Sequence, residues 1–441
     1  MIKNKTYCHI VKHQKRYLLL LAIIISSLPA LFNISDGSPL FNGTESYYYL
    51  SLLPEPIQGF PLEIALLFPV LILTISVLLY YSLAKRLNIG TTNRFYYLLL
   101  FILSPIFISS YSILSGYAIA LLLMLSGCKL LFMEKKIKYV SIIPFIAATF
   151  IDGFTSVLLL FVLLIILFNN PHKKLVTTMI GVSFLSFLIN ILCFHQQFFL
   201  GPFHHPKILA DLISDLGGFS GVSLFILLLT VIGLSLTWKK KADSWAYLFL
   251  IPLIPAYFLS TETMFYFSLV VIFFATAGLR YLLERRWAVP FLKQFTILLL
   301  FLSLLFSTIT YIERTLHQEP TAIDQEMLIW IKEYTNDEDV IFSNPEYGPY
   351  ITYFTQRSPF YSLPDNNAQK AGDAATILNS TYIKDTFPIL EENSVSIIYI
   401  TPKMKESLPE DQGLLFLFKN EKFKLLLQRE GYEIWEFRQE K

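Results

Sequence analysis

Residues 95–133 read FYYLLLFILSPIFISSYSILSGYAIALLLMLSGCKLLFM, and their only charged side chain is that of Lys129. A helix needs about 20 apolar residues to cross the hydrocarbon core of a bilayer. This stretch is therefore long enough for two membrane spans. Comparable apolar runs recur as far as residue 313, so the sequence predicts a polytopic α-helical membrane protein.

Short charged loops separate the apolar runs into eleven predicted spans. We expect these spans at residues 17–32, 61–83, 95–112, 114–133, 139–151, 154–168, 175–194, 222–238, 244–261, 264–283 and 295–313. The runs 139–151 and 154–168 are short, and they are also compatible with a re-entrant pair. Losing one of them would reverse the orientation of every later span.

Lysine and arginine predict the orientation, because basic loops stay on the cytoplasmic side. With the N-terminus inside, the inner segments collect 21 basic residues, whereas the outer loops before residue 314 contain only Lys207. The bias holds on both sides of the short pair, which favours eleven spans. No small-residue cleavage site follows the first span, so we expect an uncleaved helix rather than a signal peptide. We predict a multi-pass plasma-membrane protein.

Charge divides the chain into two predicted domains, 1–313 in the membrane and 314–441 outside the cytoplasm. Residues 314–441 contain 21 acidic and 13 basic residues, a net charge of −8. Helical spacing over 322–335, a strand in SVSIIYITP and a hairpin around Glu430-Gly431 predict an α/β domain there. A chain that is 54% hydrophobic and 15% charged is not a purely cytosolic enzyme. A nucleic-acid binder needs a concentrated basic face. The sequence has none, which excludes a nucleic-acid partner.

Acidic residues gather on the predicted outer side of the membrane domain. Eight lie there, with Lys207 as the one basic residue among them: Asp36, Glu45, Glu55, Glu63, Asp152, Asp211, Asp215 and Glu262. Carboxylates on one surface repel each other, and hard oxygen ligands suit a divalent cation such as Mg²⁺ or Mn²⁺. Such a cation would let them approach a phosphate.

The first outer loop, SDGSPLFNGTESYYYLSLLPEP at 35–56, is the most informative. It places Asp36 and Glu45 close to Tyr47, Tyr48 and Tyr49. A carboxylate can take a hydroxyl proton from a sugar acceptor while aromatic rings cover the apolar sugar faces. The alternative is a solvated loop with an interfacial tyrosine belt.

Other outer residues are open to two interpretations. Glu262 lies in the short turn STET beside the hydrocarbon, where it serves either function or helix capping. The loop that contains His204, His205 and Lys207 could hold a phosphate or a metal, or the histidines are simply interfacial. Their spacing fits no zinc pattern. No Walker, G-x-S-x-G or H-E-x-x-H motif supports ATP-driven transport or hydrolysis by serine or zinc.

Three segments resemble the GT-C superfamily of membrane glycosyltransferases. The first is Asp36 with GTESYYYL, directly after the first span. The second is SPIFISSYSILSGYAIALLLMLSGCKLLF, which is similar to the third-to-sixth-helix region of the superfamily. The third is MLIWIKEYTNDEDVIFSNPEYGPYITYFTQRSPFYSL, which resembles the outer domain of archaeal and bacterial members, including relatives of the oligosaccharyltransferase catalytic subunit.

The resemblance implies transfer of a sugar from a polyprenyl phosphate or diphosphate carrier at an outer-facing site. It implies Asp36 or Glu45 as the base, and Asp36, Glu45 and Glu262 as ligands of a divalent cation. The loop SYSILSGY lacks the second acid usual after the third span. The predicted substrate-binding residues are Tyr47, Tyr48, His204, His205, Lys207, Glu346 and Tyr347.

The last two of these belong to NPEYG at 344–348, which takes the place of the W-W-D-Y-G motif of oligosaccharyltransferases. It lacks both tryptophans, which disfavours protein N-glycosylation. The resemblance therefore favours transfer of a monosaccharide to a lipid, glycan or protein hydroxyl.

Two function classes follow. The first is a lipid-linked-sugar glycosyltransferase, and the second is a non-catalytic carrier or flippase for lipid-linked glycans or an assembly scaffold. A carrier needs ionisable groups deep within its spans. The predicted spans have almost none, which favours chemistry at the outer surface.

Overall fold

The computed structural model divides the chain into two compact units, each described separately. Unit 1 comprises Met1–Phe32 and Leu62–His317, and unit 2 comprises Asn33–Pro61 and Gln318–Lys441. The residues that the structure describes are 2–52, 65–87, 89–133, 135–151, 153–169, 173–193, 212–217, 221–240, 244–259, 263–363, 367–380, 382–408, 414 and 418–438. The predicted domain boundary at residue 313 stays a prediction. The segment Asn33–Pro61, which contains the predicted first outer loop, belongs to the same compact unit as the C-terminal segment.

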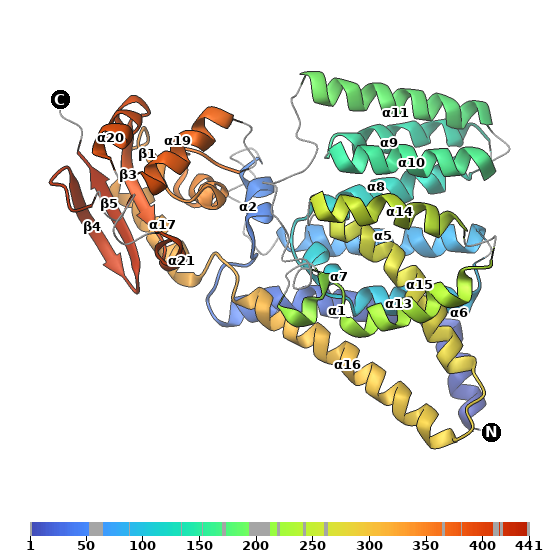
Figure 1. The fold of residues 1–441 in the computed structure, drawn as a ribbon. Helices are drawn as coiled ribbons and strands as arrows, with labels where there is room; N and C mark the ends of the chain where they lie inside the picture. Colours follow the sequence, from blue (N-terminus) through green and yellow to red (C-terminus); the bar gives the residue numbers. More distant parts are fainter. Residues whose placement is uncertain are drawn as a thin grey trace. The chain divides into compact units, whose positions relative to one another are not determined.

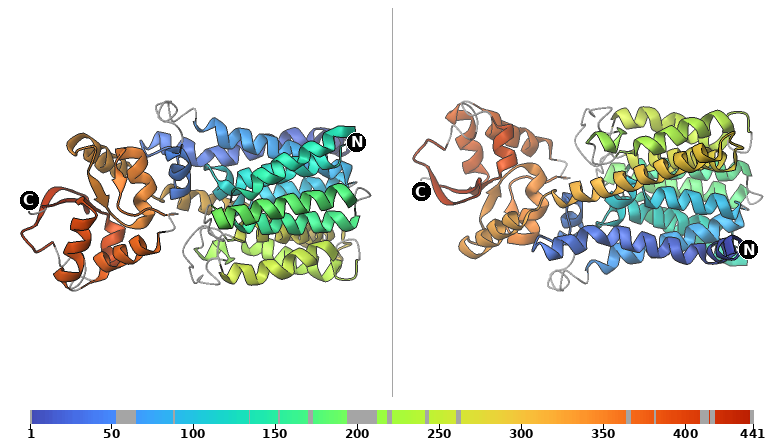
Figure 2. Two further views of the ribbon diagram at one scale, coloured as in Figure 1. Left: turned by 90° about the horizontal axis from the view of Figure 1, so that it is seen from above. Right: turned by 90° about the horizontal axis from the view of Figure 1, so that it is seen from below.

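Unit 1 is built of helices, which lie side by side in both views of Figure 2. Its α-helices are α1 (Ile2–Ser35), α5 (Leu67–Arg86), α6 (Thr91–Ile102), α7 (Pro105–Tyr111), α8 (Gly116–Leu131), α9 (Ile142–Thr149), α10 (Gly153–Asn169), α11 (Lys173–Cys193), α13 (Leu224–Thr237), α14 (Ser244–Leu259), α15 (Met264–Glu284) and α16 (Pro290–Leu316). Short 3-10 turns, η1 (Lys135–Ser141) and η2 (Ser214–Leu216), accompany them.

Within the described residues, five helices are long and apolar enough to cross a membrane, and a sixth span results if the bent pair α6 and α7 is counted as one. Five more helices of the described residues are apolar but shorter, among them those at the predicted spans 139–151 and 154–168. In its described residues, each predicted span overlaps an apolar helix or the bent pair. These helices indicate a membrane protein, while the count of eleven spans and their orientation stay predictions.

The predicted span 95–112 is interrupted, because a break divides it into α6 and α7. The two helices meet at an angle of 72°. Pro105 starts α7, where its missing amide proton costs nothing, and Ser104 accepts a hydrogen bond from the amide of Phe107 at 3.4 Å. Proline and this cap together explain why the helix starts afresh here.

Unit 2 contains a five-stranded mixed sheet with helices around it (Figure 1). The strands are β1 (Val340–Phe342), β2 (Ser358–Pro359), β3 (Val395–Ile400), β4 (Phe423–Arg429) and β5 (Tyr432–Phe437), in the order β2-β1-β3-β5-β4. β1 pairs in parallel with β2 and β3, whereas β5 runs antiparallel to β3 and β4. The helices are α2 (Thr44–Ser51), α17 (Ala322–Tyr334), η5 (Pro345–Tyr347), α18 (Gly348–Tyr350), η6 (Ile351–Thr355), α19 (Ala368–Asn379), α20 (Ile383–Glu392) and α21 (Pro402–Ser407).

Several elements of the predicted α/β domain are confirmed. The predicted helical segment 322–335 contains α17, SVSIIYITP contains β3, and β4 and β5 form the hairpin. Glu430 and Gly431 both have positive φ, at 48° and 88°, as a tight two-residue hairpin turn requires. The first outer loop differs from the prediction, because its Thr44–Ser51 segment is the helix α2.

Candidate functional site

The helix α2 has one face buried in unit 2 and one face partly open. Ser46, Tyr47 and Leu50 are buried. Glu45 lies in the first turn, and like Tyr48 it is half-buried. The helix therefore divides the three consecutive tyrosines and leaves the acid on the accessible side.

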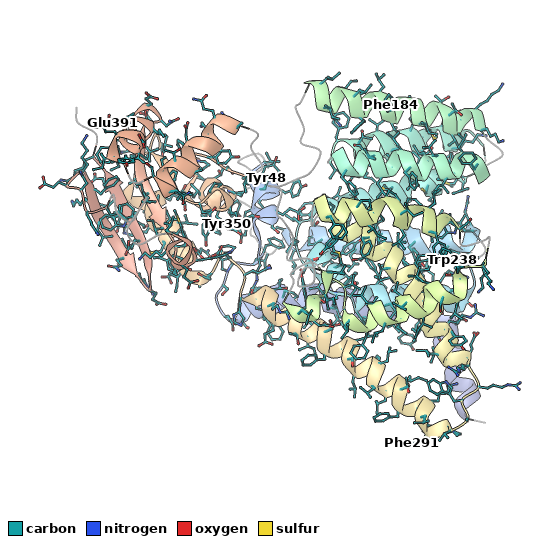
Figure 3. The ribbon with its side chains drawn as sticks, viewed as in Figure 1. Tyr48, Phe184, Trp238, Phe291, Tyr350 and Glu391 are labelled. Atoms are coloured by element: carbon teal, nitrogen blue, oxygen red, sulfur yellow. The ribbon has the colours of Figure 1, made fainter. Side chains whose placement is uncertain are left out.

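A hydrogen bond joins α2 to the start of the C-terminal segment. The amide of Gly43, which precedes α2, donates to the carbonyl oxygen of Glu319 at 2.8 Å. The hydroxyl of Tyr350 donates to the same oxygen at 3.2 Å. One backbone carbonyl thus holds both the entry to α2 and the end of α18, and the two helices lie side by side (Figure 3).

Aromatic rings complete this junction. The ring of Tyr47 lies 5.2 Å from that of Tyr350, 5.3 Å from that of Tyr353 and 5.1 Å from that of Phe354, between centroids. Its hydroxyl donates to the carbonyl oxygen of Phe41 at 3.0 Å. Burial, with a smaller contribution from Tyr353, raises the pKa of Tyr47 well above its ordinary value, so the hydroxyl remains a donor. We name Tyr47, Tyr350, Tyr353 and Phe354 the aromatic clasp.

Full burial of Tyr47 bears on its predicted contact with a sugar. Its exposed fraction is 0%, so in this structure the ring serves packing and offers no free face. The sugar contact predicted for Tyr47 stays untested. Tyr48, with its ring 5.5 Å from that of Tyr49, is half-buried and is better placed for such a contact.

Asp36 lies in a turn just after α1 and is exposed. Ser35 donates its hydroxyl to the carboxylate of Asp36 at 3.3 Å. The side-chain amide of Asn33 donates to the side-chain oxygen of Asn42 at 2.6 Å, and both asparagines are buried. This buried bond closes residues 33–42 into a loop that contains Asp36, and Glu45 lies in the helix that follows.

The NPEYG segment forms a tight helical turn rather than an open loop. Asn344 caps η5 by accepting a hydrogen bond from the amide of Glu346 at 3.1 Å. The side chain of Glu346 is exposed, whereas that of Tyr347 is buried between the rings of Tyr350 and Tyr399. Glu346 is therefore accessible, while Tyr347 packs against Tyr350 of the aromatic clasp. Their predicted substrate roles stay predictions.

A buried carboxylate that is not among the residues predicted from the sequence lies in α17. Asp324 is 0% exposed and accepts hydrogen bonds from the hydroxyls of Tyr399 at 2.7 Å and Tyr432 at 3.2 Å. It also forms a capping box with Thr321. A Thr-x-x-Asp pattern before an apolar run is the local signal that could have indicated this cap.

The remaining predicted residues have different outcomes. Asp215 serves structure, because its carboxylate accepts from the amide of Leu224 at 2.8 Å and from the hydroxyl of Ser307 at 2.6 Å. The others lie outside the described residues: Glu55, Glu63, Asp152, His204, His205, Lys207, Asp211 and Glu262.

The predicted divalent cation has two of its three proposed ligands, Asp36 and Glu45, in the described part of the chain. Among those residues no three His, Cys, Asp or Glu side chains gather as a metal site would require. The described residues therefore do not form a complete ligand set, and no chemical step is assigned to a cation here.

The fold of this chain is similar to that of solved structures. No family model matches the sequence, and no curated protein matches it. A crystal structure of the Archaeoglobus fulgidus oligosaccharyltransferase tethered to an acceptor peptide is similar over 98% of this chain and 74% of that one, with a TM-score of 0.56 and 12% identity. The archaeal oligosaccharyltransferase AglB from the same organism, with an inhibitory peptide and a dolichol-phosphate, is similar over 96% of this chain and 74% of that one, with a TM-score of 0.60 and 11% identity.

A third structure of the Archaeoglobus fulgidus enzyme, a complex with Zn and sulfate, is similar over 88% of this chain and 68% of that one, with a TM-score of 0.54 and 13% identity. The likeness extends over both units. The resemblance inferred from the sequence is thereby confirmed at the level of fold: this chain has the fold seen in the structures of the Archaeoglobus fulgidus oligosaccharyltransferase.

Proposed function

We propose that the chain is an integral-membrane glycosyltransferase that transfers a sugar from a polyprenyl phosphate or diphosphate to an acceptor hydroxyl at the outer face of the membrane. The observation that carries this proposal is the likeness of fold, over nearly the whole chain, to an enzyme captured with an acceptor peptide and with a dolichol-phosphate. Accessible acids on the first outer loop support it, since sugar transfer requires a base.

The proposed reaction is a displacement at the anomeric carbon. The carboxylate of Asp36 or Glu45 takes the proton of the acceptor hydroxyl, whose oxygen then bonds to the anomeric carbon. The bond from that carbon to the phosphate oxygen breaks, and its electron pair leaves with the polyprenyl phosphate. Lys207 is proposed to offset the charge of this leaving group.

The acceptor is proposed to be a lipid, a glycan or a protein hydroxyl. The NPEYG segment lacks the two tryptophans of the peptide-recognising motif, which argues against a sequon peptide. Glu346, exposed on η5, is the residue of this segment that could contact an acceptor.

The test is transfer by the full chain in liposomes that contain radiolabelled polyprenyl-phosphate sugars. The variants are Asp36→Asn, Glu45→Gln and the pair combined, with Glu392→Gln, an exposed acid on α20, as the matched control. General base catalysis contributes about 10²–10⁴-fold, so we expect a loss of that size when the base is removed. The control should transfer at the wild-type rate.

Three results would contradict parts of the proposal. Full activity of the combined variant would show that the base lies elsewhere. No consumption of any donor by wild type would overturn the enzymatic function. Movement of lipid-linked sugar across the vesicle without transfer would establish the carrier instead.

A further inference from the structure

We infer that Tyr350 is a positioning residue, through which the C-terminal segment holds the first outer loop and sets the place of Glu45. The inference rests on the proposed function, because it assigns Glu45 to the reaction. It gives the C-terminal segment a part in the chemical step that does not require any of its own side chains to touch the substrate.

The first argument is the shared carbonyl of Glu319. Its oxygen accepts from the amide of Gly43 at 2.8 Å and from the hydroxyl of Tyr350 at 3.2 Å. A carbonyl oxygen has two lone pairs, and both are used here. Any shift of Tyr350 or of Glu319 is therefore transmitted to Gly43, the residue that precedes α2.

The second argument is packing. Tyr350 is 2% exposed, and its ring meets Tyr47 edge-on, at an interplanar angle of 75°. Edge-to-face aromatic pairs are favourable beyond the area they bury. Tyr47 lies two residues after Glu45, so it anchors the same turn of α2 from the opposite face.

The third argument is that α2 depends on these contacts for its structure. The helix has eight residues, and no side chain caps its N-terminus at Gly43. Isolated helices shorter than about 12 residues are marginal in water. Without the ring of Tyr350, α2 should fray, and Glu45 would lose the position that a general base needs.

Small displacements of a catalytic group have large effects, about 10²-fold for a shift of about 1 Å. We therefore expect Tyr350→Leu to lower kcat by about 10²-fold while KM for the lipid-linked donor changes little. Tyr350→Phe keeps the ring and loses one neutral hydrogen bond, so its rate should fall by less than about tenfold.

The experiment compares these two variants with Phe360→Leu in the full chain. Phe360 is also 2% exposed and belongs to the core of unit 2, where it packs on Phe342. It therefore controls for a general loss of stability. The readouts are kcat and KM for sugar transfer, the thermal unfolding midpoint, and hydrogen exchange of the backbone amides in residues 41–52.

The inference is supported if Tyr350→Leu alone lowers kcat and accelerates exchange in residues 41–52 at least about tenfold, as loss of local structure does. It is overturned if Phe360→Leu has the same effects at equal loss of stability, or if Tyr350→Leu leaves both readouts unchanged. If wild type transfers no sugar, the proposed function has failed. Exchange then decides the structural claim, supporting it if only Tyr350→Leu exposes residues 41–52 and overturning it otherwise.

Discussion

The hydroxyl of Tyr399 donates a hydrogen bond to the carboxylate of Asp324 at 2.7 Å, and both residues are 0% exposed. Tyr432 donates to the other oxygen of the same carboxylate at 3.2 Å. A buried charge is costly unless hydrogen bonds satisfy it. Asp324 thus joins α17, β3 and β5, and it makes the stability of unit 2 depend on protonated phenols.

Alkaline pH should weaken this network. Burial first, and Asp324 and Glu319 among lesser causes, raise the pKa of Tyr432 to about 12 in the folded protein, from 10.0. The unfolded chain releases this proton near pH 10, so its contribution to stability is complete below pH 10 and is lost between about pH 10 and 12. We expect Tyr432→Phe to be less stable than wild type by about 1 kcal/mol at neutral pH, with a gap that shrinks over this interval.

Thermal unfolding of the full chain at a series of pH values from 8 to 12 measures this gap. Phe360→Leu is the control, because it destabilises unit 2 without removing a phenol. Its gap from wild type should be the same at every pH. A gap for Tyr432→Phe that stays constant or widens would contradict the assignment.

Gly43 should tolerate no side chain. Its φ of 83° and ψ of 146° lie in a region that glycine alone occupies readily. We expect Gly43→Ala to lower the free energy of unfolding by about 1–3 kcal/mol and to weaken the bond to Glu319. Gly372→Ala is the matched control; Gly372 lies within α19 with no atom near its added methyl group.

Because alanine is a better helix former, Gly372→Ala should stabilise by about 1 kcal/mol. Chemical unfolding of both variants in detergent measures whether each substitution lowers or raises the free energy of unfolding. Equal stability of Gly43→Ala and wild type would mean that the entry to α2 relaxes without loss.

Much of this architecture could be predicted from the sequence, where a periodic signal or a strong local motif exists. α17, β3 and the β4–β5 hairpin follow from spacing and from Glu430-Gly431. The α2 helix could not be predicted, because eight mixed residues become helical only when tertiary contacts hold them.

The candidate site, too, could be predicted only in part from the sequence. Acids and tyrosines in the first outer loop mark it in the sequence, but three adjacent tyrosines carry no sign of which one is buried. That choice depends on Tyr350 and Tyr353, some three hundred residues further along the chain. Likewise, the Thr321–Asp324 cap is local, whereas the partners Tyr399 and Tyr432 come from distant strands.

Arg357 should be critical for the end of α17. Its guanidinium, on a residue that is 8% exposed, donates to the carbonyl oxygens of Lys332 at 3.1 Å and Thr335 at 2.9 Å and pairs with Asp337. It thus satisfies carbonyls that a helix end leaves free. We expect Arg357→Gln to cost about 1.5–3 kcal/mol, the range for hydrogen bonds to a charged group.

The control is Arg438→Gln, at an exposed ion pair with Glu436. Surface pairs contribute about 0–1 kcal/mol, so its unfolding midpoint should barely move. If both arginine variants lost the same stability, the buried position of Arg357 would have no special effect.

Close packing of α13 against α15 in unit 1 gives the last prediction. A methyl group on Gly278 would overlap the backbone carbonyl of Leu229, and one on Gly233 would overlap that of Phe274. Thr230 donates its hydroxyl across the same interface to the carbonyl oxygen of Val271 at 3.0 Å. Small residues allow membrane helices to approach closely in this way.

We therefore expect Gly278→Ala to force the two helices apart, at a cost of about 1–3 kcal/mol. Gly181→Ala on α11 is the control, since its methyl group would meet no atom within 4 Å. Thermal unfolding in one detergent should separate the two variants, with Gly181→Ala at or above the wild-type midpoint. Because Gly278 contacts backbone rather than a flexible side chain, rotamer changes cannot relieve the overlap. A wild-type midpoint for Gly278→Ala would thus require that α13 and α15 are farther apart than described.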